Sequence, residues 1–532
     1  MDRRAFLKTS GVVTTASLVA FNARPVSAIG KLDAATTRQQ SIGTVRTWHF
    51  LDLWRFDHFD NLQLRQGQPE WQANATYSEP HIGSLSGWPT VFRDEESGRW
   101  RMLYSADWKP YSLMVAESED GIHWQPLPQP HIKPAGGKRA PHHLFTLPDG
   151  SGGGVYLDPV AADGFPFKVF VHQHGQEVVE RAIADPARRW HEIAKEEGAK
   201  RYVADEFALV SRDGLHWEAR YDMQWSQTDW HPEPPIFGFF NRHTGRHQMT
   251  VRPGWGDRRQ CIQSTSDLLN WSGPEMLLQP DALDEELIEL YGMPVFPYGD
   301  GYVGLPWIFH CESTEPTRGF NRSVGPLDCQ LAFSSDGNRF TRGFRTPFIH
   351  RNEPGQHGGG AIQPSSLVET DDQIRIYSAA TKLYHGKGRE ARRLGVTDNA
   401  SILLHTLRKD GLIYLESEGD WGRFMSKPLV LLEDSLTMNA SAPHGEVQFQ
   451  LTDMESQPVE GFTFNDCLPL VSTDSVAASL RWETGRLSDI VGRIVRLEVR
   501  LRHARLFAIR GNFHFIDAQD RWMIEDGKSI VT

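Results

Sequence analysis

A short turn motif recurs along the chain and constrains the fold more than any other feature. The pattern first occurs as SEDGIHW, and four copies end at an aromatic residue, namely Trp124, Trp217, Trp271 and Phe340. A fifth, looser copy contains Asp410. In such a turn the aspartate accepts hydrogen bonds from its own backbone, and the glycine supplies a positive φ. Five copies indicate one structural unit that is repeated five times. We therefore expect His123 and His216, inside the first two copies, to have a structural role.

Each copy closes a set of short segments with the character of β-strands. The first set contains WPTVFRD, RWRMLYSA and YSLMVAES, which are rich in aromatic and β-branched residues and bounded by glycine, aspartate and proline. Sets of strands that recur at intervals of roughly 50 to 90 residues are typical of a β-propeller. The sequence therefore predicts an all-β fold with five blades over residues 44–429.

The repeat stops after Ser426, and the rest of the chain alternates apolar and polar residues. The segment VRLEVRLR at 495–502 shows this period of two most clearly. Such alternation indicates strands with one buried face and gives no sign of a long helix. We predict that residues 430–532 form a C-terminal β-sandwich.

The first 28 residues have the composition of an export leader. Arg3 and Arg4 come before an apolar stretch at 12–21, and small residues end the segment at Ala28. That apolar stretch is too short to span a bilayer. The segment resembles a bacterial twin-arginine signal, which implies cleavage after Ala28 and a periplasmic or secreted protein. A Sec-type leader with chance basic residues is the alternative.

Charge and hydropathy restrict the partners. The 532-residue chain has a formal net charge of −12 and no basic run, which argues against binding to nucleic acid. No segment after the leader is long and apolar enough for a membrane span. A local cluster of arginine and histidine could still bind an anionic substrate, because local charge outweighs a modest global charge.

The repeated turns and the trailing β-sandwich together resemble the invertase, levanase and arabinanase superfamily of glycoside hydrolases. The resemblance covers nearly the whole mature chain and implies a glycan substrate. Glycosidases need an acid and a base carboxylate on either side of the scissile bond. Only Asp229 and Glu233, at the third predicted blade, supply carboxylates at a blade entrance. A furanosidase-type hydrolase that uses one of them is an alternative function, and a non-catalytic glycan-binding propeller is another.

Imidazole, phenol and guanidinium groups are more frequent than carboxylates at the predicted blade entrances and second-strand ends. They belong to His142, His143, His172, His231, Arg252, Tyr291 and His310. Such groups suit β-elimination from a uronate. An arginine neutralises the carboxylate, a histidine removes the adjacent proton, and a tyrosine protonates the leaving oxygen.

This set is similar to that of propeller-fold ulvan lyases, which use histidine, tyrosine and arginine and carry a structural zinc. We therefore predict a polysaccharide lyase that acts on an acidic, uronate-containing polysaccharide. His143 is the expected base, Tyr291 the proton donor and Arg252 the partner of the carboxylate. The residues expected to line the subsites are His142, His172, His231 and His310.

The four cysteines allow two interpretations. His247 and Cys261 flank the PGWG segment on adjacent predicted strands, and Cys311 and His385 could complete a tetrahedral zinc site with them. Alternatively, the cysteines are buried thiols, with Cys311 and Cys329 possibly paired in a disulfide. Four scattered cysteines do not form a disulfide framework.

Overall fold

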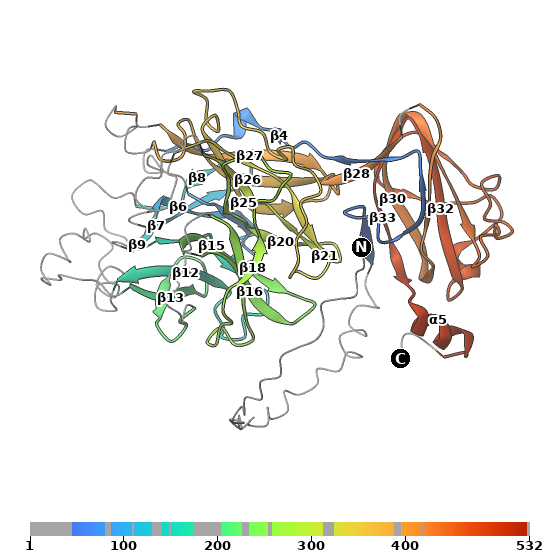
Figure 1. The fold of residues 1–532 in the computed structure, drawn as a ribbon, viewed down its shortest axis with the longest axis horizontal. Coiled ribbons are helices and arrows are strands. Elements are labelled where there is room, and N and C mark those ends of the chain that lie inside the picture. Colours follow the sequence, from blue (N-terminus) through green and yellow to red (C-terminus); the bar gives the residue numbers. More distant parts are fainter. Residues whose placement is uncertain are drawn as a thin grey trace, which may run out of the picture. The chain divides into compact units, whose positions relative to one another are not determined.

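The fold is nearly all β (Figure 1). A computed structural model describes residues 45–79, 87–108, 111–129, 141–147, 151–174, 204–225, 233–253, 258–311, 324–387, 395–396, 398–417 and 419–528. Residues 45–518 form one compact unit, and the helix α5 (Ala518–Glu525) begins at its end. The predicted leader at 1–28 lies outside the described residues, so export stays a prediction.

The first three repeats each form a sheet with four antiparallel strands in chain order. The first sheet contains β5 (Thr90–Arg93), β6 (Trp100–Trp108), β7 (Tyr111–Ser118) and β8 (Gln125–Pro126), with β9 (His143–Leu147) also beside β7. The second contains β10 (Ser151–Gly152), β12 (Phe167–His174), β13 (Ala204–Ser211) and β14 (Trp217–Arg220), with β11 (Tyr156–Leu157) also beside β12. The third contains β15 (Glu233–Asn241), β16 (Arg246–Arg252), β17 (Gln260–Thr265) and β18 (Glu275–Leu278).

The fifth repeat takes its outermost strand from the beginning of the chain. Its strands are β25 (Ala361–Glu369), β26 (Gln373–Thr381), β27 (Ala400–Arg408) and β4 (Glu70–Trp71), and the 3-10 helix η1 (Ala73–Ala75) follows β4. In the pairing of β4 with β27, Trp71 lies opposite His405. The N-terminal strand therefore completes the last sheet of the repeat.

The fourth repeat differs because its sheet is divided in two. One half consists of β19 (Ile288–Gly292), β22 (Trp307–His310) and β23 (Leu327–Cys329), and the other of β20 (Val295–Tyr298), β21 (Gly301–Gly304) and β24 (Ala332–Ser334). The first half joins the fifth sheet through a parallel pair between Leu327 and Ala361. Pro294 and Pro306 lie at the division, where each lacks the N–H that a continuous ladder needs. The described residues thus form four complete blades, and the predicted count of five is corrected.

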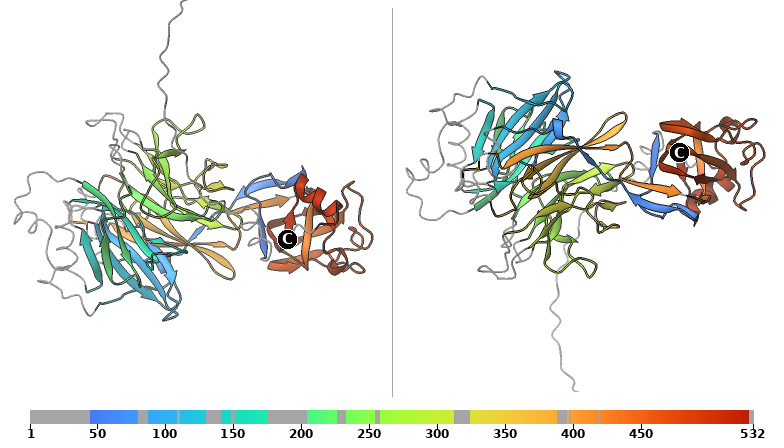
Figure 2. Two further views of the ribbon diagram at one scale, coloured as in Figure 1. Left: turned by 90° about the horizontal axis from the view of Figure 1, so that it is seen from below. Right: turned by 90° about the horizontal axis from the view of Figure 1, so that it is seen from above.

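Apolar side chains pack between successive repeats and close them into a propeller-like ring. Each of five buried clusters contains residues from two successive repeats, such as Leu103 with Val169, Val210 with Met249, Phe239 with Tyr302, Val303 with Ile376, and Tyr377 with Met102. The last pair joins the fifth repeat to the first, and Figure 2 shows these blue and orange sheets side by side in both views.

The repeated turn has the local role that its sequence predicts. In the copy between β13 and β14, Ser211 Oγ accepts a hydrogen bond from the backbone N–H of Gly214 at 2.9 Å. Asp213 Oδ1 accepts from the N–H groups of Leu215 and His216, both at 2.8 Å. Gly214 has a φ of +76°. The first copy, between β7 and β8, has the same bonds, so the structural role of both copies is confirmed.

The fifth copy of the turn is shifted by one residue. Asp410 itself has a φ of +61° and occupies the position of positive φ that glycine holds in the first, second and fourth turns and Leu268 holds in the third. Its carboxylate is fully buried and accepts a hydrogen bond from Asn439 at 2.8 Å. His49 Nε2 lies 3.0 Å from it, and Arg510 donates to both of its oxygens. This aspartate therefore binds residues from distant strands and not its own backbone.

A nine-stranded sheet contains strands from both ends of the compact unit. They are β1 (Arg46–His49), β2 (Phe56–Asp60), β3 (Gln63–Gln66), β28 (Ile413–Ser417), β29 (Gly422–Ser426), β30 (Leu429–Thr452), β31 (Leu470–Ser479), β32 (Ile494–Arg502) and β33 (Ala504–Phe515). The 3-10 helix η2 (Leu487–Ile490) precedes β32. A common core that includes Trp48, Phe424 and Val499 lies against these strands. The two-layer sandwich and its boundary at 430 stay predictions.

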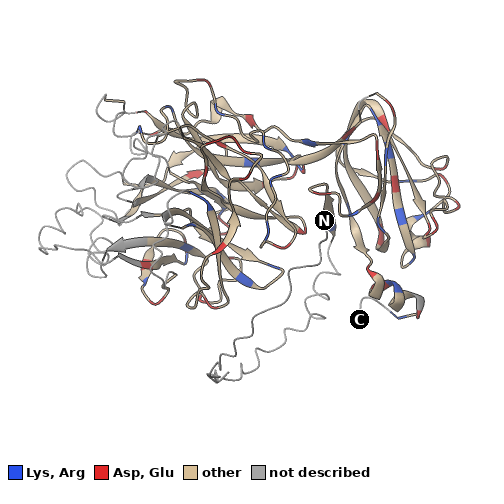
Figure 3. Ribbon diagram, in the orientation of Figure 1, with Lys and Arg blue, Asp and Glu red and all other residues tan. Residues whose placement is uncertain are grey.

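Charged residues of both signs are interspersed along the described ribbon (Figure 3). On β32, for example, Arg496, Glu498 and Arg500 alternate with buried apolar residues. Among the described residues, no helix is long and apolar enough to cross a membrane.

Candidate functional site

Tyr291 lies at the end of β19, with two arginines over its ring. The guanidinium carbon of Arg252 is 4.5 Å from the ring centroid, and that of Arg258 is 5.3 Å from it. Arg252 ends β16, and Arg258 lies just before β17. The third repeat thus contributes two cations and the fourth contributes the tyrosine. The residues predicted as proton donor and carboxylate partner lie together, although their roles stay predictions.

Aromatic side chains surround this pair of cations. Phe309 lies 5.1 Å below the guanidinium of Arg258, and the His385 ring meets the Tyr291 ring edge to face at 4.6 Å. The fully buried Trp307 lies beneath Tyr291, with its ring centroid 6.4 Å away. Burial, followed by the charges of Arg258 and Arg252, lowers the pKa of His385 to about 3. His385 is therefore neutral at neutral pH. We call Arg252, Arg258, Tyr291, Phe309 and His385 the Tyr291 cluster.

One buried glutamate binds the Tyr291 cluster through its side chain, and a second is placed beside it by backbone pairing only. Glu289 is 4% exposed and binds Arg258 Nη1 at 2.5 Å through Oε2. The backbone of Glu233, the first residue of β15, pairs with that of Arg252. Arg258 and Glu289 were missing from the sequence-based site. The spacing of two residues between Glu289 and Tyr291 could have revealed the glutamate, because residues at i and i+2 share one face of a strand.

His310 occupies the other face of the same sheet. Its Nε2 lies 2.8 Å from Asp328 Oδ2, and its Nδ1 lies 3.6 Å from Glu285. Burial lowers the pKa of His310, but the two carboxylates outweigh burial and raise it. Because neighbouring residues of a strand point to opposite faces, His310 points away from Phe309 and from the Tyr291 cluster. The expectation that it shares a subsite with Tyr291 is corrected.

His142 and His143 belong to the first sheet and not to the entrance of the second. His143 pairs with Met114 of β7, where β9 adds to the strand beyond the short β8. His142 Nε2 lies 3.3 Å from Glu79 Oε1, which also accepts a hydrogen bond from Tyr104 at 3.2 Å. The sequence placed His142 and His143 at the entrance of the second blade, but β9 binds the open edge of β7 in the first sheet. The third, fourth and fifth repeats supply the Tyr291 cluster without these histidines.

Of three other predicted residues, one is described by its backbone alone and two are not described. His172 lies in β12, where its backbone pairs with those of Ser151 and Glu206, but its side chain lies outside what the structure describes. His231 and Asp229 also lie outside the described residues.

The four predicted zinc ligands do not converge. His247 lies opposite Thr265, and Cys261 lies opposite Val251, so the two are four residues apart along the hairpin. The connection is longer after PGWG than before it, which shifts the expected register. His247 Nδ1 bonds the Tyr156 hydroxyl at 2.9 Å.

Cys311 and His385 lie elsewhere, near Phe309. Among the described residues, no group of three or more histidine, cysteine, aspartate or glutamate side chains could hold a metal ion. The four-ligand site therefore does not fit this geometry. No disulfide joins Cys311 and Cys329.

No protein-family model and no curated protein matches the chain. Among solved structures, an N-acetylgalactosamine deacetylase from F. plautii is 13% identical, with a TM-score of 0.40 over 65% of this chain and 96% of that one. A GH32 beta-fructofuranosidase from Bombyx mori is 11% identical, with a TM-score of 0.37 over 84% and 94%. An endo-arabinase from Bacteroides thetaiotaomicron is 11% identical, with a TM-score of 0.36 over 62% and 97%. Identities and TM-scores this low support no conclusion about activity or site residues.

Proposed function

We propose that the chain is an enzyme that binds and cleaves an anionic glycan at the Tyr291 cluster. One observation carries this proposal, namely the two guanidinium groups 4.5 and 5.3 Å from the Tyr291 ring centroid. Guanidinium stays charged at every physiological pH and can bind a carboxylate or sulfate with two hydrogen bonds. The partly exposed rings of Tyr291 and His385 offer a surface on which a sugar ring can pack.

We rank hydrolysis first because two glutamates belong to strands that carry this cluster. Glu233 lies opposite Arg252 in the backbone register, and Glu289 lies two residues before Tyr291. Glycosidases use two carboxylates, one to donate a proton to the leaving oxygen and one to attack or activate water. We assign the proton donor to Glu233 and the second carboxylate to Glu289, whose charge Arg258 compensates.

Elimination is the second candidate because Tyr291 and His385 are in contact. Arg252 would neutralise a uronate carboxylate, His385 would accept the proton and Tyr291 would donate one to the leaving oxygen. A general base works best when its pKa lies near the working pH. His385, with a pKa of about 3, is a weak base, and this ranks elimination below hydrolysis.

One digestion experiment separates these reactions. The full chain is incubated with polygalacturonate and other acidic polysaccharides, and both reducing ends and the ultraviolet absorbance of an unsaturated uronate are followed. We expect reducing ends without that absorbance. An increase in absorbance would establish elimination, and binding with neither product would indicate a non-catalytic propeller.

Substitutions test the assignment of residues. Glu233→Gln should lower kcat about 100-fold to 10,000-fold, because it removes the group that transfers a proton. Glu285→Gln is the matched control, since Glu285 is 80% exposed and contacts His310 on the other face of the sheet. Wild-type rates for both variants would exclude Glu233 as the proton donor.

We also propose that the protein is exported, as residues 1–28 indicate. Replacement of both Arg3 and Arg4 by lysine should reduce the periplasmic protein, because the twin-arginine route requires the arginine pair. Fractionation followed by immunoblotting measures the effect. Undiminished export of the double variant would show that the leader uses another route.

A further inference from the structure

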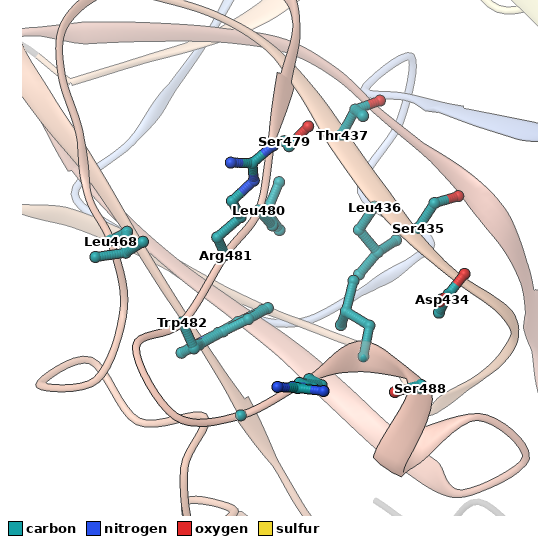
Figure 4. A pocket seen from close by; sticks show the side chains of 13 residues that line it. Asp434, Ser435, Leu436, Thr437, Leu468, Ser479, Leu480, Arg481, Trp482 and Ser488 are labelled. Carbon is teal, nitrogen blue, oxygen red and sulfur yellow. The ribbon is translucent and has the colours of Figure 1, made fainter.

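A pocket of about 570 Å³ lies in the nine-stranded sheet. Figure 4 shows Asp434 and Leu436 on one side of it and Arg481 and Trp482 on the other. A backbone hydrogen bond from Leu480 to Leu436, at 3.0 Å, joins the two sides. The pocket is thus held by the strands of the sheet itself.

The walls of the pocket are well packed and partly apolar. Trp482 is 6% exposed and packs edge-on against Phe449 and Phe462, at centroid distances of 5.0 and 5.1 Å. Leu468 at the rim is 45% exposed. Gly485 permits a close approach of two loops, since a Cβ there would lie 2.5 Å from the Gly461 oxygen. The hollow is therefore preformed.

Two arginines at the pocket differ from the other arginines of the sheet. Six of those others bind carboxylates, and they are Arg65, Arg423, Arg496, Arg502, Arg505 and Arg510. Arg481 and Arg486 are exposed, line the pocket, and make no side-chain hydrogen bond or ion pair with any described residue. Asp434 is the one carboxylate in the described lining. The pocket thus has an excess of positive charge.

We propose that this pocket is a second glycan site, which binds an acidic sugar unit through Arg481 and Arg486. Guanidinium groups without a protein acceptor can give their hydrogen bonds to a carboxylate or sulfate. Hydroxyl groups of Ser479 and Ser488 also line the pocket and suit sugar hydroxyls. The site rests on the proposed function for the choice of glycan, and it would anchor a polymer while the Tyr291 cluster cleaves it.

Affinity electrophoresis of the full chain tests this site. Arg252→Ala provides a background in which binding at the Tyr291 cluster is weakened. Gels contain polygalacturonate, dextran sulfate or neutral dextran. We expect retardation by one or both acidic polymers and none by dextran. Adding Arg481→Ala and Arg486→Ala should weaken the apparent affinity about tenfold, because charge-assisted hydrogen bonds are lost.

The matched control is Arg493→Ala, because Arg493 is exposed, lies directly before β32 of the same sheet and is outside the pocket lining. It should not change the retardation. Ser435→Trp, which fills the pocket, should reproduce the arginine effect without removing charge. Unchanged retardation of both pocket variants, or equal retardation by dextran, would overturn the proposal.

Turnover of a short oligosaccharide distinguishes this inference from the proposed function. For this assay the pocket variants are made in the otherwise wild-type chain, with Arg252 intact, and they should cleave the oligosaccharide at the wild-type rate because the Tyr291 cluster is unchanged. Loss of retardation with normal turnover supports the pocket. If the protein cleaves no glycan but its retardation still depends on the pocket residues, the proposed enzyme activity is refuted and the proposed binding site is supported.

Discussion

Asp213 and Asp410 follow the third strands of the second and fifth repeats, but their carboxylates have different partners. Asp213 is 45% exposed and accepts hydrogen bonds from its own turn. Asp410 is fully buried and binds His49, Asn439 and Arg510, which lie on three strands of the nine-stranded sheet. A shift of one residue in the turn therefore converts a local contact into a long-range one.

The difference shows that a repeated motif does not imply a repeated energetic role. An exposed carboxylate that bonds nearby N–H groups replaces bonds that water would otherwise make, so its net contribution is small. A buried carboxylate that is paired with a guanidinium group leaves uncompensated charge when it is removed. The comparison therefore predicts unequal effects of the same substitution at the two positions.

The largest effect is expected for Asp410→Ala. Removing one member of a buried ion pair costs about 3–5 kcal/mol, because Arg510 and His49 lose their acceptor. Denaturant unfolding measures the change in the free energy of unfolding. A loss no greater than that of Asp213→Ala would remove the distinction between the two turns.

The stability of the wild-type protein should fall in acid because Asp410 becomes protonated. Burial raises its pKa, but hydrogen bonds and charge from His49, with Arg510 and Asn439, outweigh burial and lower the pKa to about 2. A carboxyl group with a lowered pKa contributes stability above its unfolded pKa of about 4, and the contribution is lost as the pH falls towards 2. We expect a loss of about 2 kcal/mol over this range. Asp410→Asn should flatten the profile, and an unchanged profile would contradict the assignment.

A smaller effect is expected for Asp213→Ala. The substitution removes hydrogen bonds to Leu215 and His216 in an exposed turn, which should cost about 1 kcal/mol. The midpoint of thermal unfolding provides the measurement. A cost equal to that of Asp410→Ala would show that the local turn holds the sheet as strongly as the buried pair.

The smallest effect is expected for His216→Ala. The His216 side chain is 67% exposed and contacts Asp213 at 2.7 Å. Exposed ion pairs contribute little, so the free energy of unfolding should change by less than about 0.5 kcal/mol. Glycan cleavage should stay at the wild-type rate. A large loss of activity would contradict the structural role of this histidine.

Local patterns predicted the parts of the fold that depend on local bonds. The turn from Ser211 to Trp217 follows from its own serine, aspartate and glycine, and the sequence was sufficient to place it. The sequence also placed Arg252, at the end of a second strand, near Tyr291, at the entrance of the next blade, because successive repeats are neighbours in a ring. The roles of both residues stay predictions.

Non-local pairing explains what the sequence missed. Whether β9 would join β7 depended on how far β8 extends, and no pattern around His143 carries that information. Pro294 and Pro306 were visible, but their joint effect appears only when their strands lie side by side. Arg258 lies in an irregular segment, so periodicity could not assign it to the site.

The pairing of the first strands has a consequence for the order of synthesis. β1 pairs with β33, with Arg46 opposite Gly511, and β4 pairs with β27. A ribosome releases the N-terminal strands hundreds of residues before their partners exist. Until then their edges stay open, and such high contact order slows folding and exposes a nascent chain to aggregation. The last blade is therefore completed late. In a truncated chain that lacks residues 400–515, neither β1 nor β4 has a strand to pair with.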